Sequence, residues 1–205
     1  MMITQFTKDV IAGMLISDGY LPISKRCVNA VLKIQQANLP FTTNLYDIFK
    51  SDNLVGTAKI LTRKRFDKRT NNFYTSYSFQ TLTNLYLTEL QKMWYIEVNN
   101  KNFKIIPDNI SELLSDVALA YWLMGDGTFH KTHKYINLCT HSFRITDVVK
   151  LQNALLERKI NSSIQAVSGT QKEQYILHIM KDSVPLFSEK VFPFLISEMY
   201  YKIGY

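Results

Sequence analysis

The chain has few of the residues that mark disulfide-rich, fibrous or disordered proteins. Among its 205 residues there are only 2 cysteines, 7 glycines and 5 prolines. Cys27 and Cys139 are too few and too isolated for a disulfide framework or a zinc site, so we expect a reducing compartment. Hydrophobic residues make up 46% of the chain and aromatic residues 13%. Such a chain can bury a sizeable core, which excludes disorder and collagen-like repeats.

Long hydrophobic runs and acidic side chains are also scarce. No window approaches the ~18 uncharged apolar residues that span a membrane, and the segment from Met1 to Gln5 has neither the basic region of a signal peptide nor the Arg-rich pattern of a transit peptide. The 17 acidic side chains face 24 lysines and arginines, which leaves a net charge of +7. We therefore expect an anionic partner and no membrane association.

Two apolar segments, one in each half of the chain, end in the same Asp-Gly pair. The first reads IAGMLISDG over residues 11–19, and the second reads LAYWLMGDG over residues 119–127. The similarity continues downstream, and Lys104-Ile105 and Lys202-Ile203 close the two halves. A repeat of this length predicts a tandem duplication, with domains at residues 1–106 and 107–205.

The hydrophobic periods change in the same order within each half, from helical to alternating and back. This order predicts an α+β fold with one mainly antiparallel sheet in each half. The expected helices cover residues 7–17, 42–52, 82–95, 115–125 and 185–199, with a further helix after the cap residues 145–147. The expected strands are residues 28–34, a hairpin over 58–80 that turns at 67–72, and a hairpin over 163–180 that turns at 168–170.

The two Asp-Gly helices carry the strongest chemical signal. A carboxylate in the last turn of a helix meets the negative end of the helix dipole, at an exposed cost of about 0.3 to 1 kcal/mol. One interpretation is a simple helix stop, with Gly19 and Gly127 in the left-handed conformation. That interpretation accounts for each glycine, but it does not explain why Asp18 and Asp126 occupy the same place twice.

A catalytic interpretation explains the repeated acid. Ala12, Gly13 and Ala120 are small enough to let the two helices approach closely. If the repeats pair about a pseudo-twofold axis, Asp18 and Asp126 emerge side by side, at a spacing comparable to the DNA minor groove, about 6 Å. Two carboxylates that close repel each other unless divalent cations lie between them. Such cations can activate water and stabilise leaving oxygens on both strands of a nucleic acid.

The two segments resemble the LAGLIDADG motif. The first matches it at Ala12, Gly13, Asp18 and Gly19, and the second at Leu119, Ala120, Asp126 and Gly127. The likeness spans nearly the whole chain, including residues 140–143 and 199–202, and is to homing endonucleases that carry two motifs in one chain. The resemblance implies a monomer of two pseudo-symmetric αββαββα halves. In that fold the motif helices form the interface and the antiparallel sheets form a saddle over DNA.

The resemblance also implies an activity and its residues. It implies site-specific cleavage of both strands of a long DNA target during intron homing, across the minor groove and leaving short 3′ overhangs. Mg²⁺ would be the cofactor; Mn²⁺ is expected to substitute, and Ca²⁺ to support binding without cleavage. The implied metal ligands are Asp18, Asp126 and the backbone carbonyls of Ser17 and Gly125. The implied catalytic neighbours are Lys104 and Lys202, which would polarise solvent or stabilise the transition state, and Gln36 with Thr140 or His141, which would organise water.

A cluster of cations between Lys59 and Arg69 lies on the expected first hairpin, opposed only by Asp67. Such a run is more often just a solvated face, but a β-ribbon is narrow enough to enter a major groove about 12 Å wide. His130 and His133 are spaced like metal ligands without a second pair, so DNA contacts are favoured and zinc is not expected. The predicted DNA-binding residues are Lys25, Arg26, Asn29, Lys33, Gln35, Lys59, Arg63, Arg65, Lys68, Arg69, His130, Lys131, Lys134, Asn137, Gln165 and His178.

Two alternatives use the same scaffold. An RNA maturase that helps its host intron splice would keep the basic surface, and a DNA-binding protein that does not cut would keep it too. Retention of both acids favours cleavage, because RNA binding does not require a pair of metal-held carboxylates. Richness in Asn, Ile, Lys and Tyr indicates an AT-rich genome. This fits translation inside an organelle such as the mitochondrion, although a bacterial origin would look alike.

Overall fold

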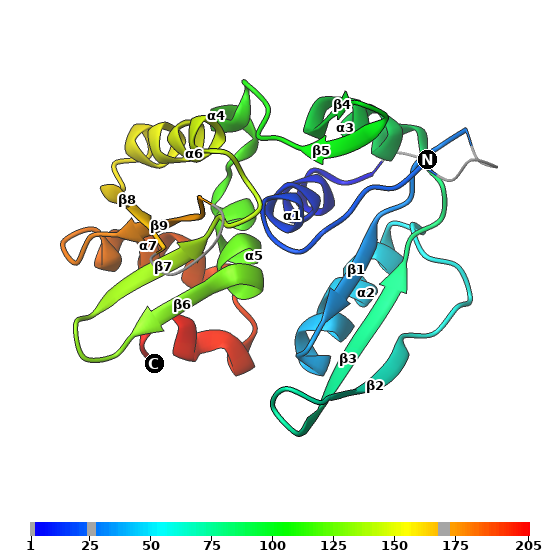
Figure 1. The fold of residues 1–205 in the computed structure, drawn as a ribbon, viewed down its shortest axis with the longest axis horizontal. Coiled ribbons are helices and arrows are strands. Elements are labelled where there is room, and N and C mark those ends of the chain that lie inside the picture. Colours follow the sequence, from blue (N-terminus) through cyan, green and yellow to red (C-terminus); the bar gives the residue numbers. More distant parts are fainter. Residues whose placement is uncertain (1–2, 24–27, 168–172) are drawn as a thin grey trace. The chain divides into compact units, whose positions relative to one another are not determined.

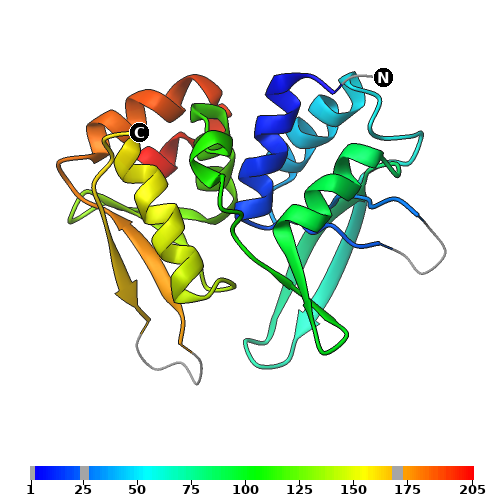
Figure 2. The same ribbon diagram turned by 90° about the horizontal axis from the view of Figure 1, so that it is seen from above.

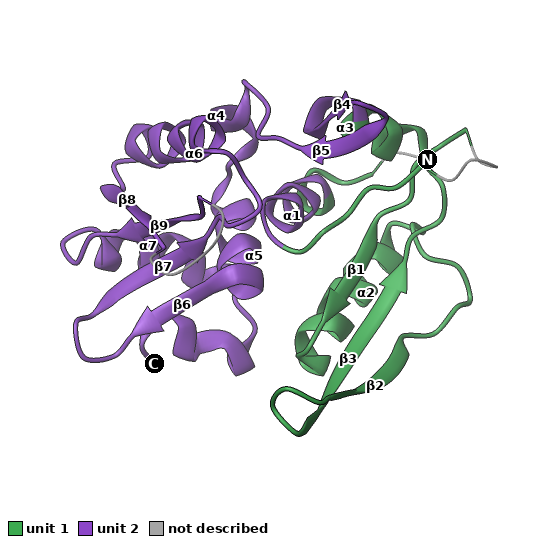
Figure 3. Cartoon of the chain, in the orientation of Figure 1, with its two compact units in different colours: residues 1–7, 18–91 green, residues 8–17, 92–205 purple. Residues whose placement is uncertain are grey.

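A computed structural model describes residues 3–23, 28–167 and 173–205. No helix among these residues is long and apolar enough to cross a membrane. The chain folds as two compact units (Figure 3): residues 1–7 with 18–91, and residues 8–17 with 92–205. These units follow packing rather than sequence repetition, so the predicted boundary of the duplication between residues 106 and 107 stays a prediction.

The first unit is built on a three-stranded antiparallel sheet of order β1-β3-β2. Its strands are β1 (Lys33–Gln36), β2 (Leu61–Asp67) and β3 (Asn72–Gln80). A single bridge between Tyr20 and Lys33 extends the sheet beyond β1. Helix α2 (Leu39–Ser51) lies against β1 and β3 (Figure 1), where Phe49 packs on Phe79 with ring centroids 5.9 Å apart. Helix α3 (Leu85–Trp94) follows β3.

Local sequence explains where α2 begins. The Asn38 side chain accepts a hydrogen bond of 2.8 Å from the backbone N–H of Phe41, and Pro40 occupies the first turn. Asparagine is a preferred N-cap, and proline fits the first turn because its missing N–H has no helical partner there. This helix was predicted from residue 42, and the cap and the proline explain its earlier start.

The second unit contains a four-stranded antiparallel sheet of order β6-β7-β9-β8. Its strands are β6 (Gly127–His130), β7 (Tyr135–Cys139), β8 (Ser162–Ala166) and β9 (Tyr175–Ile179). Helix α6 (Ile145–Glu157) lies along β8 and β9 (Figure 2). Helix α5 (Asp116–Asp126) packs against α7 (Val184–Val191), which continues into two short 3-10 helices, η1 (Phe192–Phe194) and η2 (Ser197–Ile203). Most of α1 (Gln5–Ile16), from Lys8 onward, also belongs to this unit.

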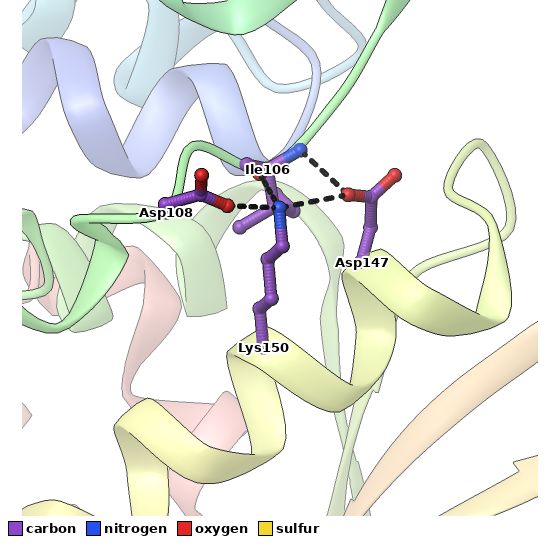
Figure 4. Close-up of polar contacts among 4 residues, drawn as sticks. All are labelled: Ile106, Asp108, Asp147 and Lys150. Atoms are coloured by element: carbon purple, nitrogen blue, oxygen red, sulfur yellow. Dashed lines mark hydrogen bonds and ion pairs between the residues drawn. The ribbon is translucent and has the colours of Figure 1, made fainter.

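Hydrogen bonds and an ion pair connect the segment that joins the two repeats to α6. This segment comprises the hairpin of β4 (Tyr95–Val98) and β5 (Lys101–Lys104) and the short helix α4 (Ile110–Leu113). The buried Asp147 carboxylate accepts a hydrogen bond of 3.2 Å from the N–H of Ile106 (Figure 4). Lys150 donates to the Ile106 carbonyl at 2.9 Å and pairs with Asp108 at 2.7 Å. The hydrogen bond and charge of Lys150 lower the pKa of Asp108.

The predicted order of elements is confirmed. The second half runs α5-β6-β7-α6-β8-β9-α7, and the first runs α1, the Tyr20 bridge, β1, α2, β2, β3 and α3. The three-stranded and four-stranded sheets are antiparallel, as is the additional two-stranded sheet of β4 and β5, so the α+β prediction of two pseudo-symmetric αββαββα halves holds. The two hairpins lie where they were expected, although the second turn, residues 168–170, falls outside the described residues.

Two further boundary predictions were wrong. The strand expected over residues 28–34 is a strand only from Lys33, because the N–H groups of Ala30 and Leu32 donate to the threonine hydroxyls of Thr88 and Thr81, both at 2.9 Å. The helix expected over residues 185–199 ends at Val191. Pro193 follows, and its ring and missing N–H end an α-helix.

Candidate catalytic and DNA-binding site

The motif helices α1 and α5 approach each other closely within the second unit. A Cβ placed on Gly13 would lie 2.4 Å from the carbonyl oxygen of Ala118 and 2.9 Å from Cβ of Tyr121. Only glycine fits such a contact, because no backbone atom can move away cheaply. Helix α5 is buried continuously from Val117 to Met124, as expected of a helix that is apolar all round. The close approach predicted from the small residues is therefore present at Gly13.

Gly127 is required because of a close contact and not because it ends the helix in the left-handed conformation. Its backbone is extended, with φ −87° and ψ 151°, and Gly204 is the glycine with positive φ in the described part of the chain. A Cβ on Gly127 would lie 2.6 Å from the carbonyl oxygen of Leu123. The left-handed interpretation is therefore wrong for Gly19 and for Gly127. The chain instead turns sharply from α5 into β6, with Asp126 at the junction.

A lysine binds the last carbonyls of each motif helix. Lys104, at the end of β5, donates to the Ser17 carbonyl oxygen at 3.2 Å. Lys202, in η2, is 7% exposed, and its Nζ lies 3.1, 2.6 and 3.3 Å from the carbonyl oxygens of Leu123, Met124 and Gly125. A cation at a helix C-terminus is favourable, because it satisfies terminal carbonyls and opposes the helix dipole. Each lysine therefore contacts the backbone directly before a motif aspartate.

Lys104 and Lys202 therefore lie beside the residues that directly precede Asp18 and Asp126, the two acids that they were predicted to assist. Their bonds to the helix carbonyls were not foreseen. The predicted action of the two lysines on solvent or on the transition state stays a prediction.

Asp18 lies in the first unit, where an amide binds its carboxylate. Nε2 of Gln36, a side chain only 9% exposed, donates to Oδ2 of Asp18 at 2.9 Å. The sequence placed Gln36 near the catalytic water, and the structure places it on the acid itself. Asp18 also opens onto a pocket of about 790 Å³. The lining of that pocket includes Tyr20, Lys33, Gln35, Lys59, Leu61, Ser78 and Gln80.

The sequence offered Thr140 and His141 as the counterparts of Gln36 in the second half. Thr140 is buried, and its hydroxyl donates to the Tyr175 carbonyl at 2.6 Å. His141 is exposed, with Nε2 4.0 Å from Sγ of Cys139. Of the two candidates, His141 is therefore the one that solvent can reach.

The oxygen donors at the two motif ends suit hard divalent cations. Among the described residues, no group of three or more His, Cys, Asp or Glu side chains could hold a metal by itself. The predicted ligands are the carboxylates of Asp18 and Asp126 and the carbonyls of Ser17 and Gly125. Mg²⁺, Mn²⁺ and Ca²⁺ prefer such oxygen ligands, and Mg²⁺ in particular is bound by one or two carboxylates together with substrate phosphates.

The exposed face of the first sheet gathers several predicted DNA contacts. Register pairs Gln35 with Ser78, Arg63 with Ser76 and Arg65 with Tyr74. Since side chains alternate along a strand, Lys33, Gln35, Arg63 and Arg65 share one face, while Ile34 and Phe79 are buried on the other.

The remaining predicted contacts of the first unit lie around that sheet. Lys59 lines the pocket beside Asp18, and Lys68 and Arg69 lie in the β2–β3 turn, with Arg69 3.8 Å from Asp67. Asn29 lies off the sheet and accepts a hydrogen bond of 3.2 Å from the Thr88 hydroxyl. Lys25 and Arg26 fall outside the described residues.

The second sheet gathers the other predicted contacts. His130 stands opposite Tyr135, Asn137 opposite His178, and Gln165 opposite Ile176. These pairs share the face that opposes the buried side chains of Ile136, Leu138, Leu177 and Ile179. Lys131 and Lys134 lie in the turn between β6 and β7. The first sheet therefore presents a polar, cationic face, and the second presents a polar face with Lys131 and Lys134 in the adjoining turn, as suits an interface with nucleic acid.

Residues 8–187 match the model of the LAGLIDADG DNA endonuclease family. The chain belongs to this family. It is 35% identical, over 62% of its length, to a cytochrome b mRNA maturase of Debaryomyces hansenii, of which it covers 45%. It is 29% identical over its whole length to DNA endonuclease I-ChuI of Chlamydomonas applanata, of which it covers 97%. The chain thus spans less than half of the maturase and nearly all of the endonuclease.

Solved structures share the fold. The homing endonuclease I-WcaI, bound to its DNA recognition sequence, superimposes with a TM-score of 0.87 at 22% identity, covering all of this chain and 88% of that one. I-DmoI in complex with DNA and Mn superimposes with a TM-score of 0.56 at 13% identity, covering 91% of this chain and 96% of that one. These likenesses confirm the predicted two-repeat LAGLIDADG fold.

Proposed function

We propose that the protein is a site-specific, divalent-metal-dependent DNA endonuclease that cuts both strands of a long target and serves intron homing. One observation carries the proposal. The same arrangement of an aspartate, the preceding backbone carbonyl and a lysine occurs in both repeats: Asp18 with Ser17 and Lys104, and Asp126 with Gly125 and Lys202. A duplicated arrangement suits a duplex, which presents the same reaction twice in opposite directions.

In this proposal the two aspartates hold the metal. A divalent cation, when bound, supplies Lewis acidity and an activated water. Gln36 holds Oδ2 of Asp18 and so leaves the other carboxylate oxygen for a cation. Lys104 and Lys202 bind the adjacent carbonyls and so offset the negative end of the helix dipole, which lowers the cost of placing an aspartate there. Gln36 and His141 are the proposed polar groups for orienting water in the two repeats.

The exposed faces of the two sheets are the proposed DNA contacts. Arg63 and Arg65 present guanidinium groups from β2, and Lys33 and Lys59 line the pocket beside Asp18. Guanidinium groups bind guanine edges and phosphates, and ammonium groups bind phosphates. We propose that cleavage occurs across the minor groove and leaves short 3′ overhangs. A single chain carrying both motifs would act as a monomer, which sedimentation of the DNA complex tests.

Mg²⁺ is the proposed cofactor, with Mn²⁺ as a substitute and Ca²⁺ supporting binding alone. The I-DmoI structures that share the fold were determined with DNA and either Mn or Mg. The hard-oxygen donors proposed above are compatible with these ions. The similarity to cytochrome b maturases and the richness in Asn, Ile, Lys and Tyr, which indicates an AT-rich genome, favour synthesis within an organelle, which we propose to be the mitochondrion.

Incubation of the protein with Mg²⁺ and linear DNA that spans an intronless insertion site tests the function. We expect one cut in each strand within that site, and the mapped ends define the overhang. Matched DNA that already contains the intron is the control and should stay intact. Failure to cut any intronless junction in Mg²⁺ or Mn²⁺ would contradict the proposal.

The similarity to a maturase favours a second candidate function, assistance in splicing of the host intron RNA. The Saccharomyces cerevisiae cytochrome b maturase is also 27% identical over 95% of this chain, which covers 46% of that protein. A variant with both Asp18→Asn and Asp126→Asn separates the two functions, because splicing does not use the acids. Faster splicing of the precursor RNA with this variant would establish maturase activity; splicing at the protein-free rate would exclude it.

A further inference from the structure

A tyrosine and a lysine stand side by side on the first sheet, with the tyrosine two residues after Asp18. Tyr20 and Lys33 form the isolated antiparallel bridge that extends the sheet beyond β1. The N–H of Tyr20 donates to the carbonyl of Lys33 at 3.1 Å, and the N–H of Lys33 donates to the carbonyl of Tyr20 at 2.8 Å. Residues paired in this way project their side chains from the same face, with Cβ atoms about 4.5 to 5.5 Å apart. Tyr20 and Lys33 are therefore neighbours on the exposed face that also carries Gln35.

Packing against the core does not account for the side chain of Tyr20, which is 51% exposed. The second repeat shows the contrasting case. There an exposed threonine, Thr128, stands two residues after Asp126. The aromatic residue follows one position later, as Phe129, and its register partner is the buried Ile136. The ring of Phe129 therefore belongs to the core side of its sheet, whereas the ring of Tyr20 lies on the face that is proposed to meet DNA.

Both side chains line the pocket of about 790 Å³ onto which Asp18 opens, and Lys59 adds a second cation to that lining. A molecule in the pocket would meet two ammonium groups and an aromatic ring next to the proposed metal ligand. Ammonium groups bind phosphates, and the face of a tyrosine ring packs on apolar groups. The lining therefore suits a ligand in which a phosphate directly adjoins an apolar group.

The sugar–phosphate backbone of a DNA duplex joins these two chemical groups. Stacking covers the faces of the paired bases, so a protein meets base edges, sugars and phosphates in the grooves. The deoxyribose presents C–H groups directly beside its phosphate, and these can pack on an aromatic ring. A ring that reached a base face instead would have to wedge between base pairs and kink the duplex.

We propose that Tyr20 and Lys33 form a subsite for one nucleotide of the DNA backbone beside a cleavage site. The ammonium of Lys33 binds the phosphate, and the ring of Tyr20 packs on the adjoining deoxyribose, which positions that strand relative to Asp18. The inference rests on the proposed function, because it requires that Asp18 take part in DNA cleavage. It gives the first repeat a contact for which the second repeat carries Thr128 at the matching position.

Single-turnover cleavage in Mg²⁺ and binding in Ca²⁺ separate positioning from affinity. Tyr20→Thr copies the residue of the second repeat, and it removes the ring while keeping a residue that suits a strand. We expect it to slow cleavage of bound DNA by about 10- to 100-fold with a smaller loss of affinity, and Tyr20→Phe to cut like the unaltered protein. Lys33→Met should make the slope of log affinity against log salt less steep by about 1. Lys64→Met, on the opposite face of β2, is the matched control and should keep that slope.

Modified DNA tests the same contacts on the unaltered protein, so the result does not depend on how a variant folds. An uncharged methylphosphonate replaces one phosphate at a time in the target. We expect a position directly beside a cut where this change weakens binding of the unaltered protein severalfold and has no further effect on Lys33→Met. At the adjoining nucleotide, a tetrahydrofuran abasic site keeps the sugar ring and a propanediol spacer removes it. The unaltered protein should cut the spacer DNA more slowly than the abasic DNA, and Tyr20→Thr should cut both at the same rate.

Several results would overturn the inference while leaving the proposed function intact. Tyr20→Thr could cut bound DNA at the unaltered rate, or Tyr20→Phe could be as slow as Tyr20→Thr, which would assign the effect to the hydroxyl group. The phosphate that depends on Lys33 could lie away from both cuts, or the unaltered protein could cut the abasic and spacer DNA equally. If the unaltered protein cut no DNA at all, the proposed function would fail and this inference with it. That outcome is distinct, because all the others are measured on a protein that cuts.

Discussion

Replacement of Lys202 by Met tests whether the lysine holds the end of the second motif helix. The side chains are similar in length, so the change removes the ammonium and leaves most of the packing. In the structure the ammonium lies within 3.3 Å of three carbonyl oxygens at the end of α5 and is almost fully buried. Lys202→Met therefore leaves these buried carbonyls without their cation.

The cost follows from those contacts. A hydrogen bond to a charged group contributes about 1.5 to 3 kcal/mol, and a cation at a helix end adds up to about 2 kcal/mol when it is partly buried. These contributions overlap, so we expect Lys202→Met to lower the free energy of unfolding by about 2 to 4 kcal/mol. Lys104→Met removes a carbonyl contact of 3.2 Å at a position that is only half-buried, where water can replace lost contacts, so it should cost less than Lys202→Met, about 1 kcal/mol.

Urea unfolding followed by circular dichroism measures both variants. Lys202→Gln provides a third comparison, since its amide keeps two donors but no charge, and it should recover part of the loss. The reasoning would be refuted if Lys202→Met were as stable as the unaltered protein, or if Lys104→Met were destabilised equally.

Three further predictions follow from other parts of the structure. Gly13→Ala should destabilise the protein by about 1 to 3 kcal/mol through overpacking against Ala118, despite the better helix propensity of alanine. Gly56→Ala is the control and should be nearly neutral, because its Cβ would meet only Leu82 at 3.4 Å. Equal effects of the two substitutions in thermal unfolding would contradict the packing argument. Because Lys150 lowers the pKa of Asp108, that carboxylate stabilises the fold above its unfolded pKa of about 3.9, and this stabilisation is lost as pH falls through the lower folded pKa. Asp108→Asn should therefore be less stable at pH 7 and indistinguishable in strong acid, and an unchanged difference across that range would refute the linkage. The affinity for DNA should fall by roughly 10³- to 10⁵-fold between 50 and 200 mM salt. Arg65→Ala should make this salt dependence less steep, whereas Lys64→Ala, on the opposite face of β2, should not. An equal effect of both substitutions would show that DNA does not bind preferentially to the face that carries Arg65.

The sequence predicted most of the fold because its signals are local. The repeated Asp-Gly segments, the small residue at Gly13 and the alternating pattern around the β2–β3 turn each depend on residues close together in the chain. These signals place the motif helices and both hairpins. Pro193 was an equally local signal for the end of α7, and the expected helix nevertheless ran through it.

The contacts that define the site could be predicted only in part. Lys202 reaches the carbonyls of Leu123 to Gly125, and Gln36 reaches Asp18, across long stretches of sequence. Such pairs depend on tertiary packing, which spacing in the chain does not reveal. The loss of the strand before Lys33 has the same origin, because the hydroxyls of Thr81 and Thr88 come from later elements.

A crystal structure of the protein with target DNA and Mn²⁺ tests the central proposal most directly, since Mn²⁺ is located by its anomalous scattering. We expect anomalous peaks within about 2.3 Å of carboxylate oxygens of both Asp18 and Asp126, each peak also contacting a phosphate of the DNA. Peaks that avoid either carboxylate, or carboxylates that lie far from any phosphate, would contradict the account.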